Sequence, residues 1–505
     1  MHPAPTCDRC LTRRQCLKMF SAAALGSGLA GGIIRAADEP KSAAPAPPIQ
    51  AMDPAKAVDV ARLRPAPKVR IQTAVLRQPL PYWLGWPGTS YDVEKYSKEY
   101  LQKTRESSQR LGIDAQIEPK PVEDENGFAA LLAKAKAEKP DALLVILQHM
   151  SCWDWADRLS KEAGVPLIVF SPVGTSFTGH VLGISRRPGT HVVSSLEWSA
   201  VEAGFRMVKA KRMLEESRIL WIQGNQRNET VLERLGTKVR AIPRDSFNKL
   251  FDQVPMTAEV KDIAADMRRR AQRIVEPTEQ DTQNSARAYV TAKMLMEAEG
   301  AHALSMDCLG MVHSKLVPTP PCGAWTLLQD QGITAGCEAD LFGATSMMLT
   351  SYLLDRPGYM NDPVAETAKN LLIASHCTSG TRLAGFDKAP APYILRSHSE
   401  SNLGVSVQVV WPAGEPVSLI RFTGPGEVIV DTGLVVSNID TPPAGGCRTS
   451  IEIKMDDIED ARDVLGFHQV VTLGNHKRTV QSFCQLYGMR MIHSPEKAPH
   501  GEGSA

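Results

Sequence analysis

The sequence predicts an α/β protein in which two Rossmann-like α/β domains precede a β-rich, barrel-like C-terminal domain. Through the first two thirds of the chain, short apolar runs alternate with segments of helical spacing, which is typical of parallel sheets covered by helices. Beyond about residue 363, apolar and polar residues alternate between Gly/Pro turns, which indicates antiparallel strands. The 505 residues are enough for several domains.

The first α/β domain is predicted to cover residues 69–180. Its apolar runs are four to eight residues long, as expected of buried strands, and each is followed by a segment with apolar residues at helical spacing. We expect strands at 69–76, 114–117, 142–148 and 166–170, and helices at 93–111, 128–139 and 155–163.

The second α/β domain is predicted at 181–355 and the β-rich domain at 356–495. In the second domain we expect helices at 197–216, within 257–273 and 281–299, and at 322–331 and 341–354, with strands at 219–223 and 303–308. In the third we expect strands at 405–411, 417–422, 427–437 and 449–454, and a helix at 478–487. No P-loop or Rossmann glycine fingerprint follows any predicted strand, which disfavours nucleotide cofactors.

The first 37 residues have the composition of an export signal. Arg13 and Arg14 precede an uncharged, Ala/Gly-rich run at 19–34, and small residues follow it. This order predicts a twin-arginine signal peptide and a periplasmic or equivalent location, with a short membrane anchor as the competing interpretation. Residues 38–68 are predicted to be an Ala/Pro-rich linker, and residues 496–505 a disordered tail.

Charge and cysteine content exclude several classes of protein. The 57 Lys and Arg residues nearly balance the 56 Asp and Glu residues, so no nucleic-acid partner is expected. No uninterrupted apolar run of about 18 residues occurs beyond the first 40 positions, so no membrane span is expected there. Three of the ten cysteines precede residue 37, and the other seven form no close pairs, which predicts free thiols.

Four residues in the last third of the chain are candidates for a metal site. Glu338 lies just before a predicted helix, and Asp362 follows that helix. His376 ends an apolar run, and His468 precedes another. Two carboxylates and two imidazoles suit Mn²⁺ or a similar divalent metal, with positions left for substrate oxygens.

Each candidate also has a purely structural interpretation. Glu338 and its neighbour Asp340 can be helix-capping acids. Asp362 before proline is a common turn and cap combination. His376 and His468 can be hydrogen-bonded histidines of an apolar core. The spacing by itself does not decide between these interpretations and a metal site.

The order of these motifs resembles the L-fucose isomerase and L-arabinose isomerase superfamily. The resemblance is carried by residues 320–363, by the segment Ser375-His376-Cys377-Thr378, and by Gly466-Phe467-His468. It implies that Glu338 and Asp362 are the first and second acids that bind Mn²⁺, and that His376 and His468 are the intermediate and late histidines. Phe467 stands where that superfamily commonly has a first histidine of a pair.

The resemblance implies a metal-dependent aldose–ketose isomerase that acts on an open-chain monosaccharide. Glu338 and Asp362 are then expected to be the catalytic acid/base pair, and the expected assembly is a homotrimer or homohexamer whose neighbouring first domain covers the cleft. Two alternatives remain: a non-catalytic exported sugar-binding protein with the same fold, and a lyase or epimerase that uses the same enediolate chemistry.

Overall fold

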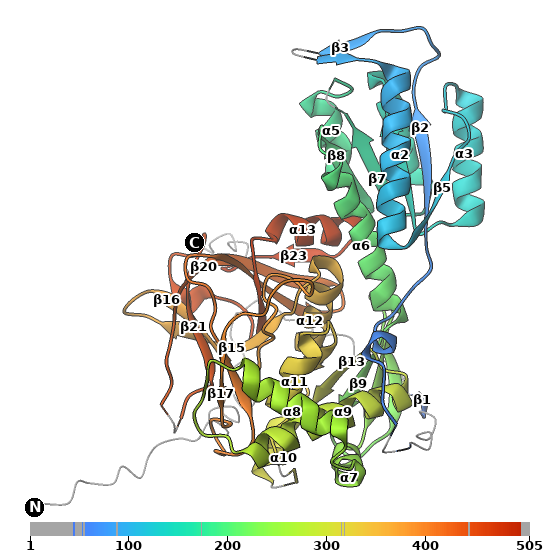
Figure 1. Cartoon of the computed structure of the whole chain (residues 1–505). Coiled ribbons are helices and arrows are strands. Elements are labelled where there is room, and N and C mark those ends of the chain that lie inside the picture. The colour runs from blue at the N-terminus through green and yellow to red at the C-terminus, as the bar shows by residue number, and fades with distance from the viewer. Residues whose placement is uncertain are drawn as a thin grey trace, which may run out of the picture. The chain divides into compact units, whose positions relative to one another are not determined.

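The computed structural model describes residues 44–45, 53, 56–86, 89–172, 174–314, 316–317, 319–442 and 445–495 (Figure 1). The predicted signal at 1–37 and the tail at 496–505 lie outside the described residues, as does part of the predicted linker. Within that linker, residues 56–68 include the short 3₁₀ helix η1 (Val60–Leu63), and Val58 and Leu63 are buried against a hydrophobic core.

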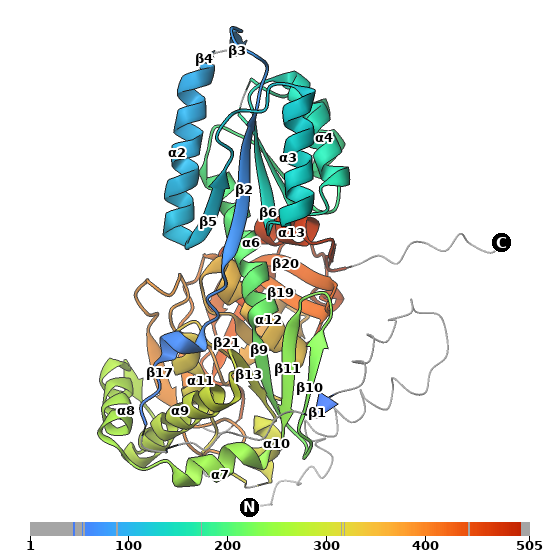
Figure 2. The same ribbon diagram turned by 90° about the vertical axis from the view of Figure 1, so that its right-hand side faces the viewer.

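The first sheet is parallel throughout and has the order β5-β2-β6-β7-β8. Helices cover both of its faces, with α2 on one side and α3 and α4 on the other (Figure 2). The strands are β2 (Val69–Leu76), β5 (Ile113–Ile117), β6 (Ala142–Leu147), β7 (Leu167–Ser171) and β8 (Thr190–Ser194), and the helices are α2 (Val93–Leu111), α3 (Glu125–Glu138), α4 (Trp153–Glu162) and α5 (Thr178–Ser185). β6 is buried along its whole length, which explains its unbroken apolar sequence.

The second sheet has the order β1-β10-β11-β9-β13-β14, and its last four strands are parallel. Its strands are β1 (Ala44–Pro45), β9 (Arg218–Ile222), β10 (Asn228–Leu232), β11 (Thr237–Ile242), β13 (Ala303–Met306) and β14 (Thr334–Gly336). Its helices are α6 (Ser199–Glu216), α7 (Asp245–Gln253), α8 (Ala258–Arg270), α9 (Glu279–Glu299), α10 (Cys308–His313), α11 (Cys322–Gln329) and α12 (Leu341–Leu354). The β10–β11 hairpin was not expected from the sequence.

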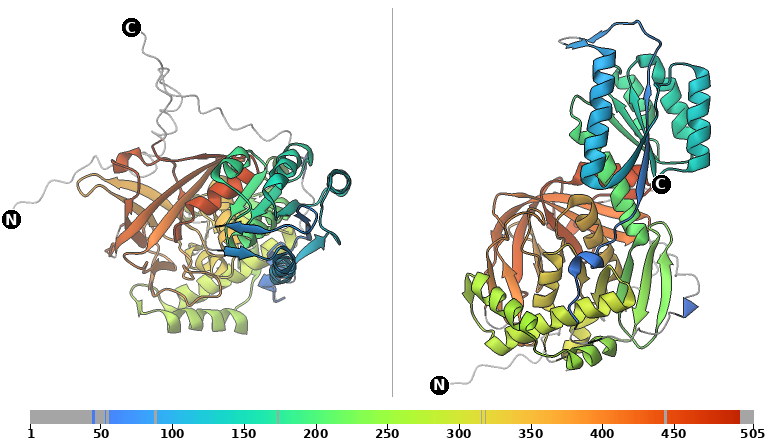
Figure 3. Two further views of the ribbon diagram at one scale, coloured as in Figure 1. Left: turned by 90° about the horizontal axis from the view of Figure 1, so that it is seen from above. Right: turned by 45° about the vertical axis from the view of Figure 1, so that its right-hand side comes forward.

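The C-terminal strands close into a six-stranded barrel in the order β19-β22-β15-β16-β21-β20, because β20 pairs back with β19. They lie in the orange to red part of Figure 3. The strands are β15 (Tyr359–Glu366), β16 (Leu371–His376), β19 (Pro416–Gly424), β20 (Glu427–Asn438), β21 (Thr449–Met455) and β22 (Gln469–Leu473). β23 (Arg490–Ile492) pairs with β20, and α13 (Lys477–Leu486) precedes it.

One expected barrel strand belongs elsewhere. Residues 405–411 were expected to pair with the other C-terminal strands, but β18 (Ser406–Val409) joins β12 (Arg273–Ile274) and β17 (Tyr393–Arg396) in a separate three-stranded sheet. β18 is buried on both faces, so its alternating sequence does not reflect one solvent-facing side. The protein is thus a mixed α/β structure with parallel sheets and a closed six-stranded barrel.

The described helices and cysteines can be compared with the predictions of no membrane span and of free thiols. Across the described ranges, every helix is too short or too polar to cross a lipid bilayer. The seven cysteines of the described part, from Cys152 to Cys484, are all free thiols, and six of them are buried. The expectation of free thiols is therefore confirmed for this part of the chain.

Candidate metal centre

Glu338 lies at the carboxyl end of β14, where the chain crosses to α12. Glu338 and Ala339 both have positive φ, 56° and 53°, a conformation that costs roughly 1–3 kcal/mol per residue outside glycine. Hydrogen bonds hold this turn: Ala339 N donates to Met306 O (2.9 Å), and Trp221 Nε1 donates to Ala339 O (2.6 Å). The neighbouring strands β13 and β9 thus fix the backbone that carries Glu338.

Asp362 and His376 come from two paired barrel strands. In the antiparallel register of β15 and β16, Asp362 is opposite Ser375, so His376 lies one residue beyond this pair. Both side chains are buried, with 8% and 5% of the residue exposed. Asp362 therefore belongs to a regular strand, and the interpretation of this residue as a turn acid was wrong.

His468 directly precedes β22 and is also held in the left-handed region, with a φ of 53°. The residue is 3% exposed. The ring of Phe467 stacks on its imidazole with 4.2 Å between ring centroids, while Phe467 itself remains 47% exposed. The residue that replaces a histidine in the resemblance therefore forms an apolar cover over His468.

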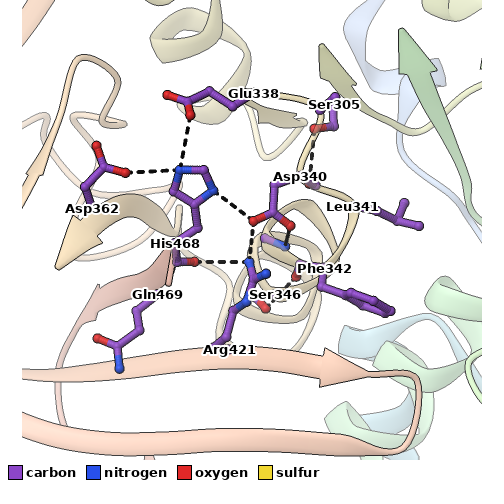
Figure 4. Close-up of polar contacts among 12 residues, drawn as sticks. Ser305, Glu338, Asp340, Leu341, Phe342, Ser346, Asp362, Arg421, His468 and Gln469 are labelled. Carbon is purple, nitrogen blue, oxygen red and sulfur yellow. Dashed lines mark hydrogen bonds and ion pairs between the residues drawn. The ribbon is translucent and has the colours of Figure 1, made fainter. Parts of the chain in front are cut away.

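The four predicted residues meet at one place, where the carboxyl end of β14 faces the barrel. His468 Nε2 lies 3.1 Å from Asp362 Oδ1 and 3.7 Å from Glu338 Oε2 (Figure 4). His376 Nε2 lies 3.7 Å from Glu338 Oε1. Potential ligand atoms of Glu338, His376 and His468 all lie within 4.8 Å of one another, the spacing of a group that can hold a metal ion.

Asp340 adds a third carboxylate behind the histidine. Its Oδ2 lies 2.9 Å from His468 Nδ1 and 2.7 Å from a guanidinium nitrogen of Arg421, which comes from β19 (Figure 4). Its Oδ1 accepts the backbone N–H of Gly343 at 2.8 Å and so caps α12. The capping interpretation is thus confirmed for Asp340, whereas the carboxylate of Glu338 points toward His468 (Figure 4) and lies 3.7 Å from His376 Nε2.

The buried acids and imidazoles of this centre shift one another's pKa values. Burial alone would raise the pKa of Glu338, but His376 and His468 lower it below its ordinary value, so this carboxylate is ionised at neutral pH. Burial alone would lower the pKa of His468, but Asp340, Asp362 and Glu338 raise it to about 9. Glu338 and Asp362 likewise raise the pKa of His376.

These residues fit a divalent metal ion. Both ring nitrogens of His376 are buried and have no hydrogen-bond partner among the described residues, which is costly unless a ligand satisfies them. His468 presents Nε2 to the acids while its Nδ1 contacts a carboxylate, the arrangement common in histidines that bind metal. Oxygen and imidazole donors together suit Mn²⁺ or another borderline cation.

The sequence pattern missed two residues of this centre. Asp340 was considered only as a helix cap, and a cap motif carries no information about a distant histidine. Arg421 was not considered at all. The available signal was its position, since Arg421 is the only charged residue of this strand and lies between Ile420 and Phe422.

No family model matches this chain, but a known protein is similar to part of it in sequence. Over 136 residues the chain is 27% identical to a sulfoquinovose isomerase from Clostridium sp. (strain MSTE9). This match covers 27% of the present chain and only 30% of the relative.

Among solved structures, a solute-binding protein of an ABC transporter from Burkholderia multivorans shares 9% identity. It aligns over 58% of this chain and 95% of that protein, with a TM-score of 0.18. The relative that matches in sequence is a sugar isomerase, and this match confirms the similarity of the chain to the L-fucose isomerase and L-arabinose isomerase superfamily.

Proposed function

We propose that this protein is a metal-dependent aldose–ketose isomerase acting on an open-chain monosaccharide. The observation that carries the proposal is the meeting of Glu338, Asp362, His376 and His468 at one buried position. The partial match to a sugar isomerase supports the reaction class. The sugar-binding alternative has no comparable support, because binding alone does not require ionised acids beside two imidazoles.

Glu338, Asp362, His376 and His468 would hold the divalent cation, with Mn²⁺ as the first candidate. When bound, such a cation polarises a carbonyl and makes the adjacent C–H more acidic. Glu338 is ionised, so one of its carboxylate oxygens can accept the C2 proton and return it to C1 through a cis-enediol. Asp362, whose Oδ1 lies 3.1 Å from His468 Nε2, would take and return the hydroxyl proton.

The wall of the centre restricts access of water to these groups. Asp362, His376 and His468 are each less than 10% exposed, and the ring of Phe467 covers the imidazole of His468. A partly dry site strengthens the interaction of each charged group with the reacting atoms.

Three further parts of the proposal rest on the sequence and the superfamily resemblance. We propose two Rossmann-like domains with boundaries near residues 180 and 355, followed by the barrel domain. We also propose a homotrimer or homohexamer. The paired arginines at positions 13 and 14 support export by the twin-arginine route.

The test is an isomerisation assay in D₂O. Mn²⁺-loaded protein is incubated with a panel of aldoses and ketoses, including sulfoquinovose, and the products are followed by NMR. We expect one sugar to be isomerised with incorporation of deuterium, and removal of the metal with EDTA to stop the reaction. Sugar binding without isomerisation or exchange, across a panel that includes the bound sugar, would instead support the sugar-binding alternative.

A further inference from the structure

Asp340 divides its two carboxylate oxygens between two tasks. Oδ1 accepts the N–H of Gly343 at 2.8 Å and caps α12. Oδ2 takes no part in that cap and contacts His468 Nδ1 at 2.9 Å. A helix cap requires only one oxygen, so the cap does not explain why the second oxygen contacts a histidine 128 residues further along the chain.

Arg421 holds the same group from the barrel side. Its Nη1 donates to Asp340 Oδ2 at 2.7 Å and to the backbone carbonyl of His468 at 3.4 Å. One guanidinium nitrogen therefore touches both the carboxylate and the backbone of the histidine that has positive φ. The side chains of Arg421 and Asp340 are only 14% and 13% exposed, so water competes little for this ion pair.

The first turn of α12 leaves room for this arrangement. A Cβ atom at Gly343 would lie 2.6 Å from Met360 Sδ, 3.0 Å from a guanidinium nitrogen of Arg421 and 3.1 Å from Asp340 Cγ. A larger residue would thus press on both members of the ion pair. The glycine at the third helical position therefore supplies both the capped N–H and the space that the pair occupies.

We propose that Asp340 and Arg421 are positioning residues that orient the imidazole of His468 for metal binding. This inference rests on the proposed function. A carboxylate at Nδ1 keeps the proton on that atom and leaves the Nε2 lone pair for a metal. His468 Nε2 is the atom that faces Glu338 and Asp362. Arg421 fixes the carboxylate and the backbone, so the ring has one orientation.

The first experiment measures Mn²⁺ affinity, with free Mn²⁺ quantified by electron paramagnetic resonance. Asp340→Asn keeps a capping side chain but removes the charged acceptor at Nδ1, and we expect the dissociation constant to rise about 10–100-fold. Asp124→Asn is the matched control, because Asp124 caps α3 by accepting the N–H of Gly127 at 2.8 Å. The control should leave the affinity unchanged. Equal affinities for Asp340→Asn and wild type would overturn the proposal.

A double-mutant cycle tests whether Asp340 acts through His468. In a His468→Ala background, Asp340→Asn should change Mn²⁺ affinity by less than about twofold, because the residue that it orients is gone. The same fold-loss in both backgrounds would mean that Asp340 acts as a distant charge, and this result would overturn the positioning role.

Circular dichroism and thermal unfolding first establish that each variant is folded. If Asp340→Asn does not fold, Arg421→Gln tests the same positioning role through the other member of the ion pair. We expect a several-fold loss of Mn²⁺ affinity that Arg421→Lys partly restores, and unchanged affinity in Arg421→Gln would contradict the proposal. A wild-type protein that binds no Mn²⁺ would refute both the proposed function and the positioning role. Normal Mn²⁺ binding by the wild type, with unchanged affinity in the variants, would refute the positioning role alone.

Discussion

Two helices of this protein begin with the same type of cap, but the capping acids differ in burial and in the residues that they contact. Asp124 before α3 and Asp340 before α12 each accept the N–H of a glycine three residues later, both at 2.8 Å. Asp124 is exposed, while Asp340 is mostly buried between His468 and Arg421. The local sequence Asp-x-x-Gly thus determines the cap, and the tertiary surroundings determine whether the acid has any chemical role.

The histidines near the first and second sheets also differ in their surroundings. His149 follows β6 of the first sheet, and burial lowers its pKa below the ordinary value. His468 faces β14 of the second sheet, where carboxylates outweigh burial and raise its pKa to about 9. The end of a parallel strand is therefore not enough to form a metal site. The barrel must also contribute an acid and two imidazoles.

The largest effect is expected from Glu338→Gln. If Glu338 moves the proton, this near-isosteric change should lower the isomerisation rate by about 10²–10⁴ and suppress exchange of the C2 hydrogen with D₂O, since an amide cannot accept the proton. Asp362→Asn should lower the rate in the same range. Asp124→Asn at the other helix should have no effect on rate. Full exchange in Glu338→Gln would exclude this residue as the base.

The next effect concerns the metal. His468→Ala should weaken Mn²⁺ binding at least tenfold, a loss expected even of groups that only support a ligand. His376→Ala should also weaken Mn²⁺ binding, but by less than His468→Ala. His149→Ala is the matched change near the first sheet and should leave the affinity unaltered. Comparable losses for His149 and His468, measured by equilibrium dialysis, would break the contrast between the two regions.

A smaller effect is expected in the pH dependence of the metal-free protein. The pKa of His468 is about 9 in the fold and ordinarily 6.5, so the stability that its protonation contributes is complete below about pH 6.5 and is lost as pH rises toward 9. The sign is opposite for His149, whose lowered pKa favours the fold above pH 6.5. We expect His468→Gln to flatten the fall of the melting temperature between pH 6.5 and 9. An unchanged slope in that variant would show that His468 is not charged in the folded protein.

The smallest effect is expected from Asp124→Ala. Loss of this exposed cap should lower the free energy of unfolding by about 1 kcal/mol and leave metal binding and turnover intact. Chemical denaturation and Mn²⁺ titration measure the two quantities on the same sample. A loss of Mn²⁺ affinity here would mean that the first sheet also supports the metal centre.

Local pattern was enough to predict the long helices and several buried strands, but it missed other strands, including β8, β15 and β16. β2 and α12 have the predicted bounds, because an unbroken apolar run and a capped helix are both encoded by neighbouring residues. Pairing between distant strands is not encoded in this way. For that reason the sequence did not show that β18 leaves the barrel for a three-stranded sheet, or that β20 returns to β19 to close the barrel.

The candidate metal ligands could be predicted from the sequence, but the residues that contact and position them could not. Glu338, Asp362, His376 and His468 could be chosen because acids and histidines are rare beside apolar strands, and because their order resembles a known superfamily. Asp340 and Arg421 lie 81 residues apart and meet only through the packing of α12 against β19. No local motif records such a meeting.

The central claim is that Glu338, Asp362, His376 and His468 together hold a divalent metal ion. The most direct test is anomalous diffraction at the manganese edge from crystals of the Mn²⁺-loaded protein. The account predicts one anomalous peak per chain, within coordination distance of the Glu338 and Asp362 carboxylates and of Nε2 of His376 and His468. Crystals of protein shown to contain Mn²⁺ that place the peak elsewhere, or give no peak between these side chains, would contradict it.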